Sequence, residues 1–142
     1  MAITQAICST FKQELLQGVH NFTASTGNTF KLALYTSAAT LSSATTAYSA
    51  TNETTGTGYT AGGGTLVSLG VSLSGTTAYL SFNDYTWSAA TISAAGALLY
   101  NSSASNKAVA VFSFGGTYSS TAGNFTISFP ANTSTTAVII LN

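Results

Sequence analysis

The first part of the chain shows a helical pattern of apolar positions. Apolar residues recur every four positions from Ile3 to Leu15, and Leu16 widens the stripe that they form. Polar residues take the other positions, so the pattern predicts one amphipathic helix over residues 4–18, with Gly18 as its stop signal. We expect this helix to lie apart from the rest of the fold, either packed on an open sheet edge or reaching toward a neighbouring molecule.

After residue 28 the pattern changes to short strands. Most of these segments alternate apolar and polar residues, which is typical of strands with one buried face. Residues 107–114 are apolar on both faces and therefore predict a central strand. No second helical pattern appears, which disfavours a parallel β/α layout. The predicted strands are 29–35, 67–73, 77–82, a weak one between Ile92 and Tyr100, 107–114, 125–129 and 137–141.

Seven or eight short strands separated by Gly, Ser, Asn and Thr turns indicate a mainly β fold. We predict an antiparallel β-sandwich or a jelly-roll-like barrel with one N-terminal α-helix. The chain would divide into an N-terminal helical arm, residues 1–22, and a single β-sandwich domain, residues 23–142. Two segments without a clear pattern, Ser37–Tyr48 and Thr51–Gly64, exceed the usual loop length and are either partner-contacting loops or plain surface excursions.

Charged residues are scarce along the whole chain. It has three Lys, no Arg and three acidic residues, so 4% of positions are charged, where an ordinary domain has roughly 25%. Such a chain lacks the basic patch that nucleic acids require. A folded monomer of this mass exposes roughly 6,800 Å², covered here mostly by Ser, Thr, Asn and Gly. Copies with such a neutral surface repel one another weakly, so we expect self-association or a fixed place in an assembly.

Groups for catalysis or metal binding are few and scattered. Cys8 is the single cysteine and lies in an apolar pattern, which favours a buried thiol over a nucleophile. His20, the single imidazole, lies 12 residues further on and has no acidic neighbour in the sequence to orient it. The glycine-rich segment Thr51–Gly64 lacks the Gly-Lys-Ser/Thr ending of a phosphate-binding loop and is better explained by turns with positive φ. We therefore expect no enzymatic activity, no cofactor and no metal site.

The sequence also bears on the compartment. Residues 1–22 lack a positively charged start, and polar residues interrupt any apolar core, so no signal peptide is predicted. No run of 18 apolar residues exists, so no membrane span is predicted. The single cysteine has no internal partner for a disulfide, which favours assembly in a reducing compartment.

Aromatic residues are the remaining candidates for binding. Exposed rings on a β-sandwich would suit sugar stacking, but such sites usually add charged groups for the hydroxyls, and these are scarce here. Tyr also pairs well across strands, so core or interface packing is the favoured interpretation. The rings considered are Tyr35, Tyr48, Tyr59, Tyr79, Tyr85, Trp87, Tyr100 and Tyr118. The candidate residues for contact with a partner are Ile7, Phe11, Leu15, Tyr59 and Trp87.

Several stretches of the chain carry a family likeness. The first are Met-Ala-Ile-Thr-Gln-Ala (1–6), Phe-Lys-Gln-Glu-Leu-Leu-x-Gly-x-His-x-Phe (11–22) and Thr-Phe-Lys-Leu-Ala-Leu-Tyr-Thr-Ser-Ala-Ala-Thr-Leu (29–41). Further along come Gly-Thr-Gly-Tyr-Thr-Ala-Gly-Gly (56–63), Gly-Ala-Leu-Leu-Tyr-Asn (96–101) and residues 122–130. Together they resemble a group of small virion proteins of tailed bacteriophages. The likeness covers nearly the whole chain, which departs from the group in being poorer in charge near Lys107 and after Thr117.

The resemblance implies a structural protein of the phage particle. It favours a capsid decoration or cement protein on the outside of the head, which would form a homo-oligomer, commonly a trimer, and clamp neighbouring major capsid subunits. The implied location is the virion, assembled in the cytoplasm of the bacterial host, with no nucleic acid or membrane as partner. Two alternatives stay open, namely a tail, neck or fibre component and a glycan-binding module for host attachment.

Overall fold

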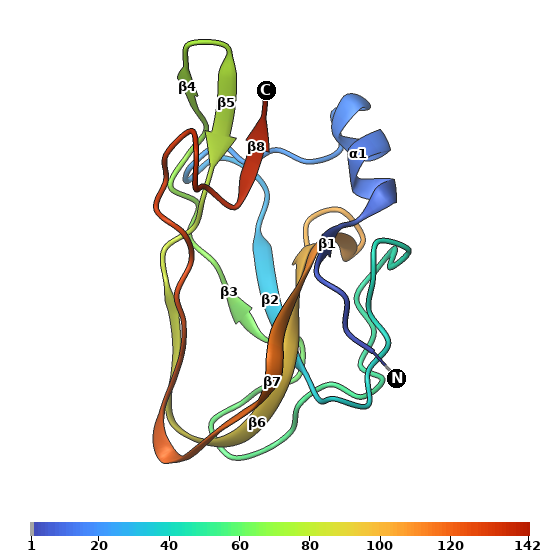
Figure 1. Cartoon of the computed structure of the whole chain (residues 1–142), viewed down its shortest axis with the longest axis vertical. Coiled ribbons are helices and arrows are strands. Elements are labelled where there is room, and N and C mark those ends of the chain that lie inside the picture. Colours follow the sequence, from blue (N-terminus) through green and yellow to red (C-terminus); the bar gives the residue numbers. More distant parts are fainter. Residues whose placement is uncertain (1) are drawn as a thin grey trace.

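The computed structural model describes residues 2–142 and contains, over that range, eight strands and one helix (Figure 1). The strands form a five-stranded sheet in the order β1-β7-β6-β2-β3 and a three-stranded sheet in the order β4-β5-β8. All strand pairs are antiparallel, so the fold is mainly β and β-sandwich-like, as the alternating pattern predicts. The elements are β1 (Ala6–Ile7), α1 (Ser9–Leu16), β2 (Phe30–Tyr35), β3 (Gly64–Thr65), β4 (Ser72–Ser74), β5 (Thr77–Leu80), β6 (Tyr85–Asn101), β7 (Lys107–Ile127) and β8 (Ile139–Leu141).

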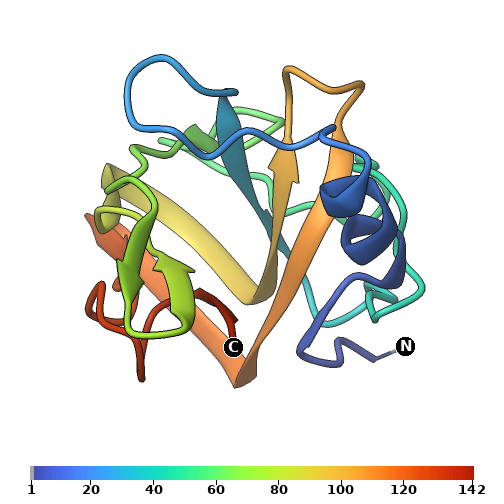
Figure 2. The same ribbon diagram turned by 90° about the horizontal axis from the view of Figure 1, so that it is seen from above.

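The hairpin of β6 and β7 is the largest element of the fold. β6 has 17 residues and β7 has 21, and their pairing shifts register at four places between Trp87 and Tyr100. Such irregularities bend a strand and raise its twist. Seen from above, both strands turn in a V (Figure 2). Trp87 on one arm and Leu98 on the other belong to the same core, so one bent hairpin lines two sides of it.

The predicted central strand over residues 107–114 is confirmed as the first part of β7. β7 lies between β6 and β1 in the five-stranded sheet. Its residues from Ala108 to Val111 are buried, as expected for a strand that is apolar on both faces.

The predicted helix over residues 4–18 is too long. The helix is α1, which has eight residues and begins at Ser9. Within residues 2–142, no helix is long and apolar enough to cross a membrane. Ala6 and Ile7 instead form β1, which pairs with the outer edge of β7. The outer edge of β7 would otherwise leave its backbone N–H and C=O groups without partners. Ala6 and Ile7 therefore pair with this edge as a strand and do not form the first turn of the predicted helix. Gly18, with a φ of 73°, follows the end of the helix and confirms the stop signal.

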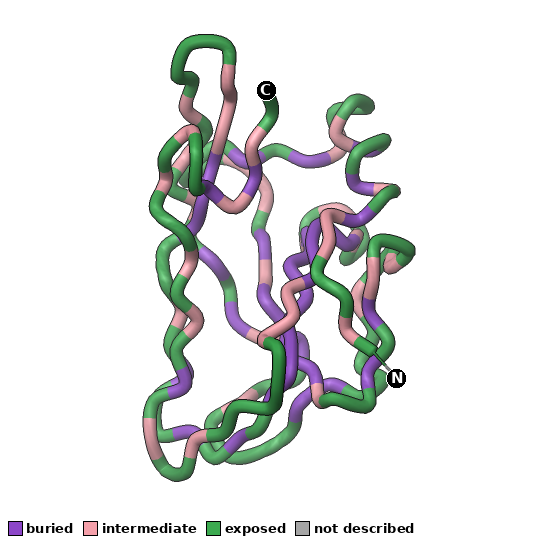
Figure 3. Tube along the Cα trace, in the orientation of Figure 1, coloured by how far each residue is buried: buried purple, intermediate pink, exposed green. Residues whose placement is uncertain are grey.

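The core joins the N-terminal segment to the β-structure. Phe11 packs edge-on against Phe22, with ring centroids 5.9 Å apart, and Phe22 stacks on Phe30 at 4.3 Å. Cys8 is fully buried, as predicted. The buried positions run along β2 and through the β6–β7 hairpin and also include residues of the N-terminal segment (Figure 3). The described part of the predicted arm, residues 2–22, therefore shares one core with residues 23–142.

The segment 67–73 differs from its prediction. Its alternation predicts a strand with a buried apolar face, but only Ser72–Ser74 forms a strand, β4. The four apolar side chains of the segment are all exposed, namely Val67, Leu69, Val71 and Leu73. The backbone of the segment pairs with residues 77–83, but the described chain supplies no element that covers its apolar side chains, so they stay exposed.

The two long segments are irregular but are tied to the sheets. Leu41 is buried, its backbone N–H donates to Ala2 over 3.1 Å, and its carbonyl accepts from Thr4 over 2.9 Å. Glu53 and Thr54 are buried in the second segment. Both segments therefore cover the core rather than standing away from it.

Candidate functional site

One end of the molecule exposes aliphatic side chains. Leu16 on α1 is 92% exposed, Leu73 on β4 71% and Leu141 on β8 52%. These three elements lie at the same end of the molecule (Figure 1). Ala78 on β5 pairs with Leu73 on one side and with Leu141 on the other. The end of the three-stranded sheet therefore presents an uncovered apolar face.

A cleft separates this sheet end from the helix, and we call it the α1–β8 cleft. It has two adjoining parts of about 550 and about 410 Å³, which share Leu15, Ile139 and Leu141. Ile139 is buried, so the cleft reaches down to the core, while its upper walls carry the exposed side chains. The residues that line it are Ile7, Phe11, Lys12, Leu15, Leu16, Gly18, His20, Asn21, Phe22, Thr23, Val71, Leu80 and residues 137–141.

The structure brings three of the five candidate partner-contact residues together in this cleft. Ile7 and Leu15 are half-buried on its wall, and Phe11 is buried beneath it. The opposite wall, which β8 and Val71 supply, is not predicted from the sequence. A signal for it was present, because the alternating segment 67–73 and the final strand are both rich in apolar residues and carry no charge.

Tyr59 and Trp87, the other two candidates, lie outside the cleft and next to each other. Their ring centroids are 5.8 Å apart, and Trp87 also packs on Tyr85 at 4.5 Å. Trp87 is 5% exposed, so its ring is part of the core. Among the aromatic residues considered for sugar stacking, Tyr35 and Tyr100 are also buried, whereas Tyr118 is exposed.

A buried carboxylate holds the segment Thr51–Gly64 in place. The Glu53 Oε2 accepts from the Tyr48 hydroxyl over 2.6 Å. Its Oε1 accepts from the Tyr59 hydroxyl and from the Gly62 N–H, both over 2.7 Å. The Tyr100 hydroxyl donates to the carbonyl of Gly62 over 2.6 Å. These bonds compensate the burial of the charge, and they help to fix an irregular segment whose backbone, before β3, pairs with the sheet only at isolated bridges.

The tyrosines of this cluster act as hydrogen-bond donors. Burial, together with the charge of Glu53, raises the pKa of Tyr48 and of Tyr59 above its ordinary value. The same causes raise the pKa of Tyr100 to about 12. The phenols therefore stay protonated at neutral pH, and the cluster anchors the chain rather than exchanging protons.

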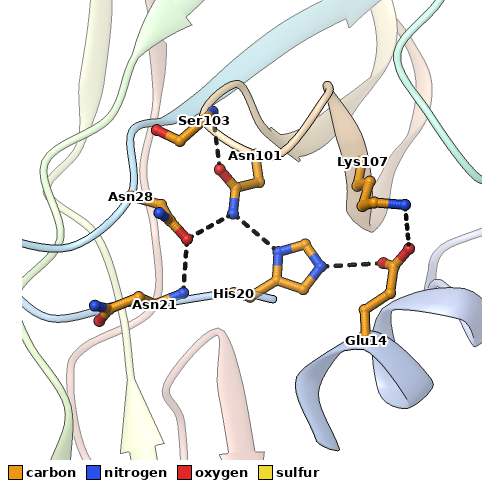
Figure 4. A network of polar contacts seen from close by, with 7 residues as sticks. All are labelled: Glu14, His20, Asn21, Asn28, Asn101, Ser103 and Lys107. Carbon is orange, nitrogen blue, oxygen red and sulfur yellow. Dashed lines mark hydrogen bonds and ion pairs between the residues drawn. The ribbon is translucent and has the colours of Figure 1, made fainter. Parts of the chain in front are cut away.

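A second polar network links α1 to the turn between β6 and β7 (Figure 4). The carboxylate of Glu14 lies 3.0 Å from the His20 Nε2 and 3.1 Å from the Lys107 Nζ. The Asn101 Nδ2 donates to the His20 Nδ1 and to the Asn28 Oδ1, both over 3.0 Å. Since Nδ1 accepts, Nε2 carries the proton and donates to Glu14. His20 therefore has an acidic partner that its neighbours in the sequence do not supply, because the chain turns back after α1.

Neither network contains an activated nucleophile. Burial and the nearby charge of Glu14 raise the pKa of the Cys8 thiol to about 11, the reverse of what a catalytic cysteine needs. Burial also acts to raise the pKa of Glu14, but the hydrogen bonds from His20 and Lys107 outweigh it and hold the pKa below its ordinary value. Within residues 2–142, no group of three or more His, Cys, Asp or Glu side chains is placed to hold a metal ion.

Comparisons with known proteins give no match. No protein-family model, no curated protein and no solved structure is significantly similar to the chain. No activity, ligand or partner therefore comes to this chain from a matching protein.

Proposed function

We propose that the chain is a structural protein of a tailed-phage particle, a decoration or cement protein on the outside of the head. It would bridge neighbouring major capsid subunits as a homo-oligomer, such as a trimer, and would have no enzymatic activity. Its place would be the virion, assembled in the cytoplasm of the bacterial host. The sequence stretches that resemble small virion proteins of tailed phages support this context.

The observation that carries the proposal is the exposed apolar end on a molecule with almost no charge. The chain exposes 6958 Å², and two of its six charged side chains, Glu14 and Glu53, are buried. A surface this poor in charge, with Leu16 and Leu73 uncovered, is typical of a protein that is covered by partners in its working state.

A shell suits such a surface because it repeats the same contact many times. Each contact can be small, since oligomer contacts and lattice contacts act together once one of them has formed. In a closed symmetric arrangement the apolar end of every copy is covered, so that no apolar surface is left exposed.

A tail, neck or fibre component is the alternative within the same particle, and it differs only in location. The glycan-binding alternative depends on Tyr118, because Trp87 is buried and its substitution would disturb the core. Tyr118 borders a shallow hollow of about 450 Å³ on β7. A glycan-array signal that Tyr118→Ser abolishes would favour this third function.

The test is to locate the protein in the particle. An antibody raised against the recombinant chain is applied to whole virions and to emptied, tail-less heads, and bound antibody is imaged with gold. We expect label over the whole surface of the heads. Label confined to tails would favour the alternative location, and the absence of label from heads would overturn the cement function.

A further inference from the structure

The polar network around His20 joins separate parts of the chain (Figure 4). His20 follows α1, and its side chain is fully buried. Its Nε2 meets the Glu14 carboxylate on the helix, and its Nδ1 meets the Asn101 amide at the end of β6. Asn101 is itself fully buried and also bonds to Asn28, which precedes β2. The single imidazole of the chain therefore connects α1 to the sheet through two hydrogen bonds.

Two backbone N–H groups fix the direction of the hydrogen bonds in this network. The Ser103 N–H donates to the Asn101 Oδ1 over 3.0 Å. The Asn21 N–H donates to the Asn28 Oδ1 over 2.8 Å. A backbone N–H can only donate, so both amide oxygens are held in place. Turning the Asn101 amide around would break its bonds to Ser103 and Asn28, so its Nδ2 stays directed at the imidazole. The Nδ1 of His20 therefore faces a donor and accepts from it only without a proton.

A proton on Nδ1 would also bring a second positive charge into the network. The Glu14 carboxylate lies 3.1 Å from the Lys107 Nζ, so its charge is already balanced. The carboxylate attracts a charged ring, but the neutral ring already donates to it through Nε2. The Cys8 thiol near Glu14 has a pKa raised to about 11 and is uncharged at neutral pH. A charged imidazole would therefore leave this buried site with a net positive charge and with two donors facing each other.

Phenyl rings flank the imidazole. The centroid of the Phe11 ring lies 4.9 Å from that of His20, and the centroids of Phe22 and Phe30 lie 6.4 Å from it. These rings help to exclude water, and they carry no oxygen or nitrogen that could accept from a second ring N–H. The site can therefore take up a protonated imidazole only by opening.

We propose that protonation of His20 releases α1 and the segment that follows it from the turn between β6 and β7, so that the network is an acid-sensitive latch. The latched form is complete with the neutral imidazole, whereas the released form exposes the ring to water and takes up one proton more. Because the two forms differ by this proton, falling pH favours release and rising pH restores the latch. Release uncovers Phe11 and Phe22 and leaves the pairing of β6 with β7 in place.

The test follows hydrogen exchange of the full-length chain between pH 7 and pH 5. Histidine is the side chain whose charge ordinarily changes in this range. The pKa of Glu14 is held below its ordinary value of 4.5, so its carboxylate stays ionised throughout. Protection factors, which correct for the effect of pH on exchange itself, should fall about tenfold or more in residues 13–19. In residues 97–99 of β6 they should change less than about twofold. Constant protection of residues 13–19, or an equal fall in both segments, would overturn the latch.

The matched variant is His20→Gln. Its side-chain oxygen can accept from Asn101 and its N–H can donate to Glu14, but it takes up no proton. We expect the protection of residues 13–19 in this variant to change less than about twofold over the same pH range. If their protection falls as far as in the unmodified chain, the release does not come from His20, and the inference is overturned.

A second measurement needs no substitution. Nitrogen NMR of the single imidazole distinguishes a ring with its proton on Nε2 from a ring with protons on both nitrogens. We expect the Nε2–H form at pH 7 and a doubly protonated ring only in molecules whose α1 amides have lost protection. A doubly protonated ring in a chain whose α1 amides stay protected would show that the latch accepts the charged form, and this result would overturn the inference.

Discussion

Glu53 accepts hydrogen bonds from Tyr48, Tyr59 and Gly62, which all lie within a few residues of it in the chain. Its burial would be costly without them, because a carboxylate loses its hydration inside the fold. With three donors in place, one charge orders a segment that has little secondary structure. The side chain of Glu53 thus adds to the few backbone bridges that hold this segment to the sheet.

Glu53→Gln is the direct test of this anchor. The amide keeps one acceptor and replaces the other oxygen with N–H groups, so a buried donor loses its acceptor. We expect the free energy of unfolding, measured by chemical denaturation, to fall by about 1–3 kcal/mol. Asp84→Asn is the control, because its amide oxygen still accepts from the Phe129 N–H at the surface, and it should change stability by less than about 0.5 kcal/mol. Equal losses in both variants would contradict the role of Glu53.

Glu14 gives the fold a dependence on acid. Its pKa is held below the ordinary value of 4.5, so its ionised form stabilises the folded state. This contribution is fully present above the ordinary pKa and is lost as the pH falls through the pKa of the folded state. We expect the melting temperature of Glu14→Gln to lie below that of the unmodified chain at pH 6 and the gap to close toward pH 3. A gap that stays constant with pH would rule out this linkage.

At the scale of elements, the alternating pattern predicts most of the sheet. The predicted strands 29–35 and 77–82 match β2 and β5 to within two residues at each end. The length of β6 and β7 could not be predicted, because bulges let one strand continue where the alternation breaks. The helix was overestimated for a related reason, since the free edge of β7 is a tertiary feature that the spacing from Ile3 to Leu15 does not reveal.

Substitution of Phe11 tests whether α1 belongs to the core of the chain or acts as an arm that docks on a neighbour. Its ring is 2% exposed and packs on His20 and Phe22, so Phe11→Ala should lower the free energy of unfolding of the isolated chain by about 3–5 kcal/mol. Leu16→Ala, on the outside of the same helix, should change it by less than about 0.5 kcal/mol. A stable Phe11→Ala chain that fails only in assembly would instead indicate a docking arm. The measurement is chemical denaturation followed by circular dichroism.

Gly63 makes the turn into β3. It has a φ of 79°, and a side chain there would run into the carbonyl oxygen of Leu32. Gly63→Ala should therefore cost at least about 2 kcal/mol of stability in a denaturation experiment. Gly116→Ala is the matched control, because a Cβ on Gly116 meets no other atom within 4 Å. If the two variants are equally stable, the close approach of this segment to β2 is not required.

At the scale of the whole molecule, the low charge has two consequences. Inside, the few charged groups pair with one another or with phenols, as Glu14 does with Lys107 and Glu53 with Tyr48. At the surface, the small number of charged groups leaves little electrostatic repulsion between copies of the chain, and one end of the molecule is apolar. The charged residues are few and scattered along the sequence, and their pairing could not be predicted because the fold brings together residues as distant as Glu14 and Lys107.

The α1–β8 cleft was predictable only in part, because the fold joins segments that are distant in the sequence. The helical spacing of Ile7, Phe11 and Leu15 identifies one wall of the α1–β8 cleft from the sequence alone. The other wall needs the pairing of β4, β5 and β8, which joins segments from different parts of the chain. Trp87 is an attractive candidate by residue type, but packing against Tyr85 and Phe125 makes it a core residue.

A cryo-electron microscopy map of the phage head, compared with a map of heads that lack this protein, tests the cement function most directly. We predict difference density on the outer surface that repeats with the capsid lattice and fits the chain. The end that carries Leu16, Leu73 and Leu141 should face the shell. Heads whose maps show no such density would contradict the proposed function.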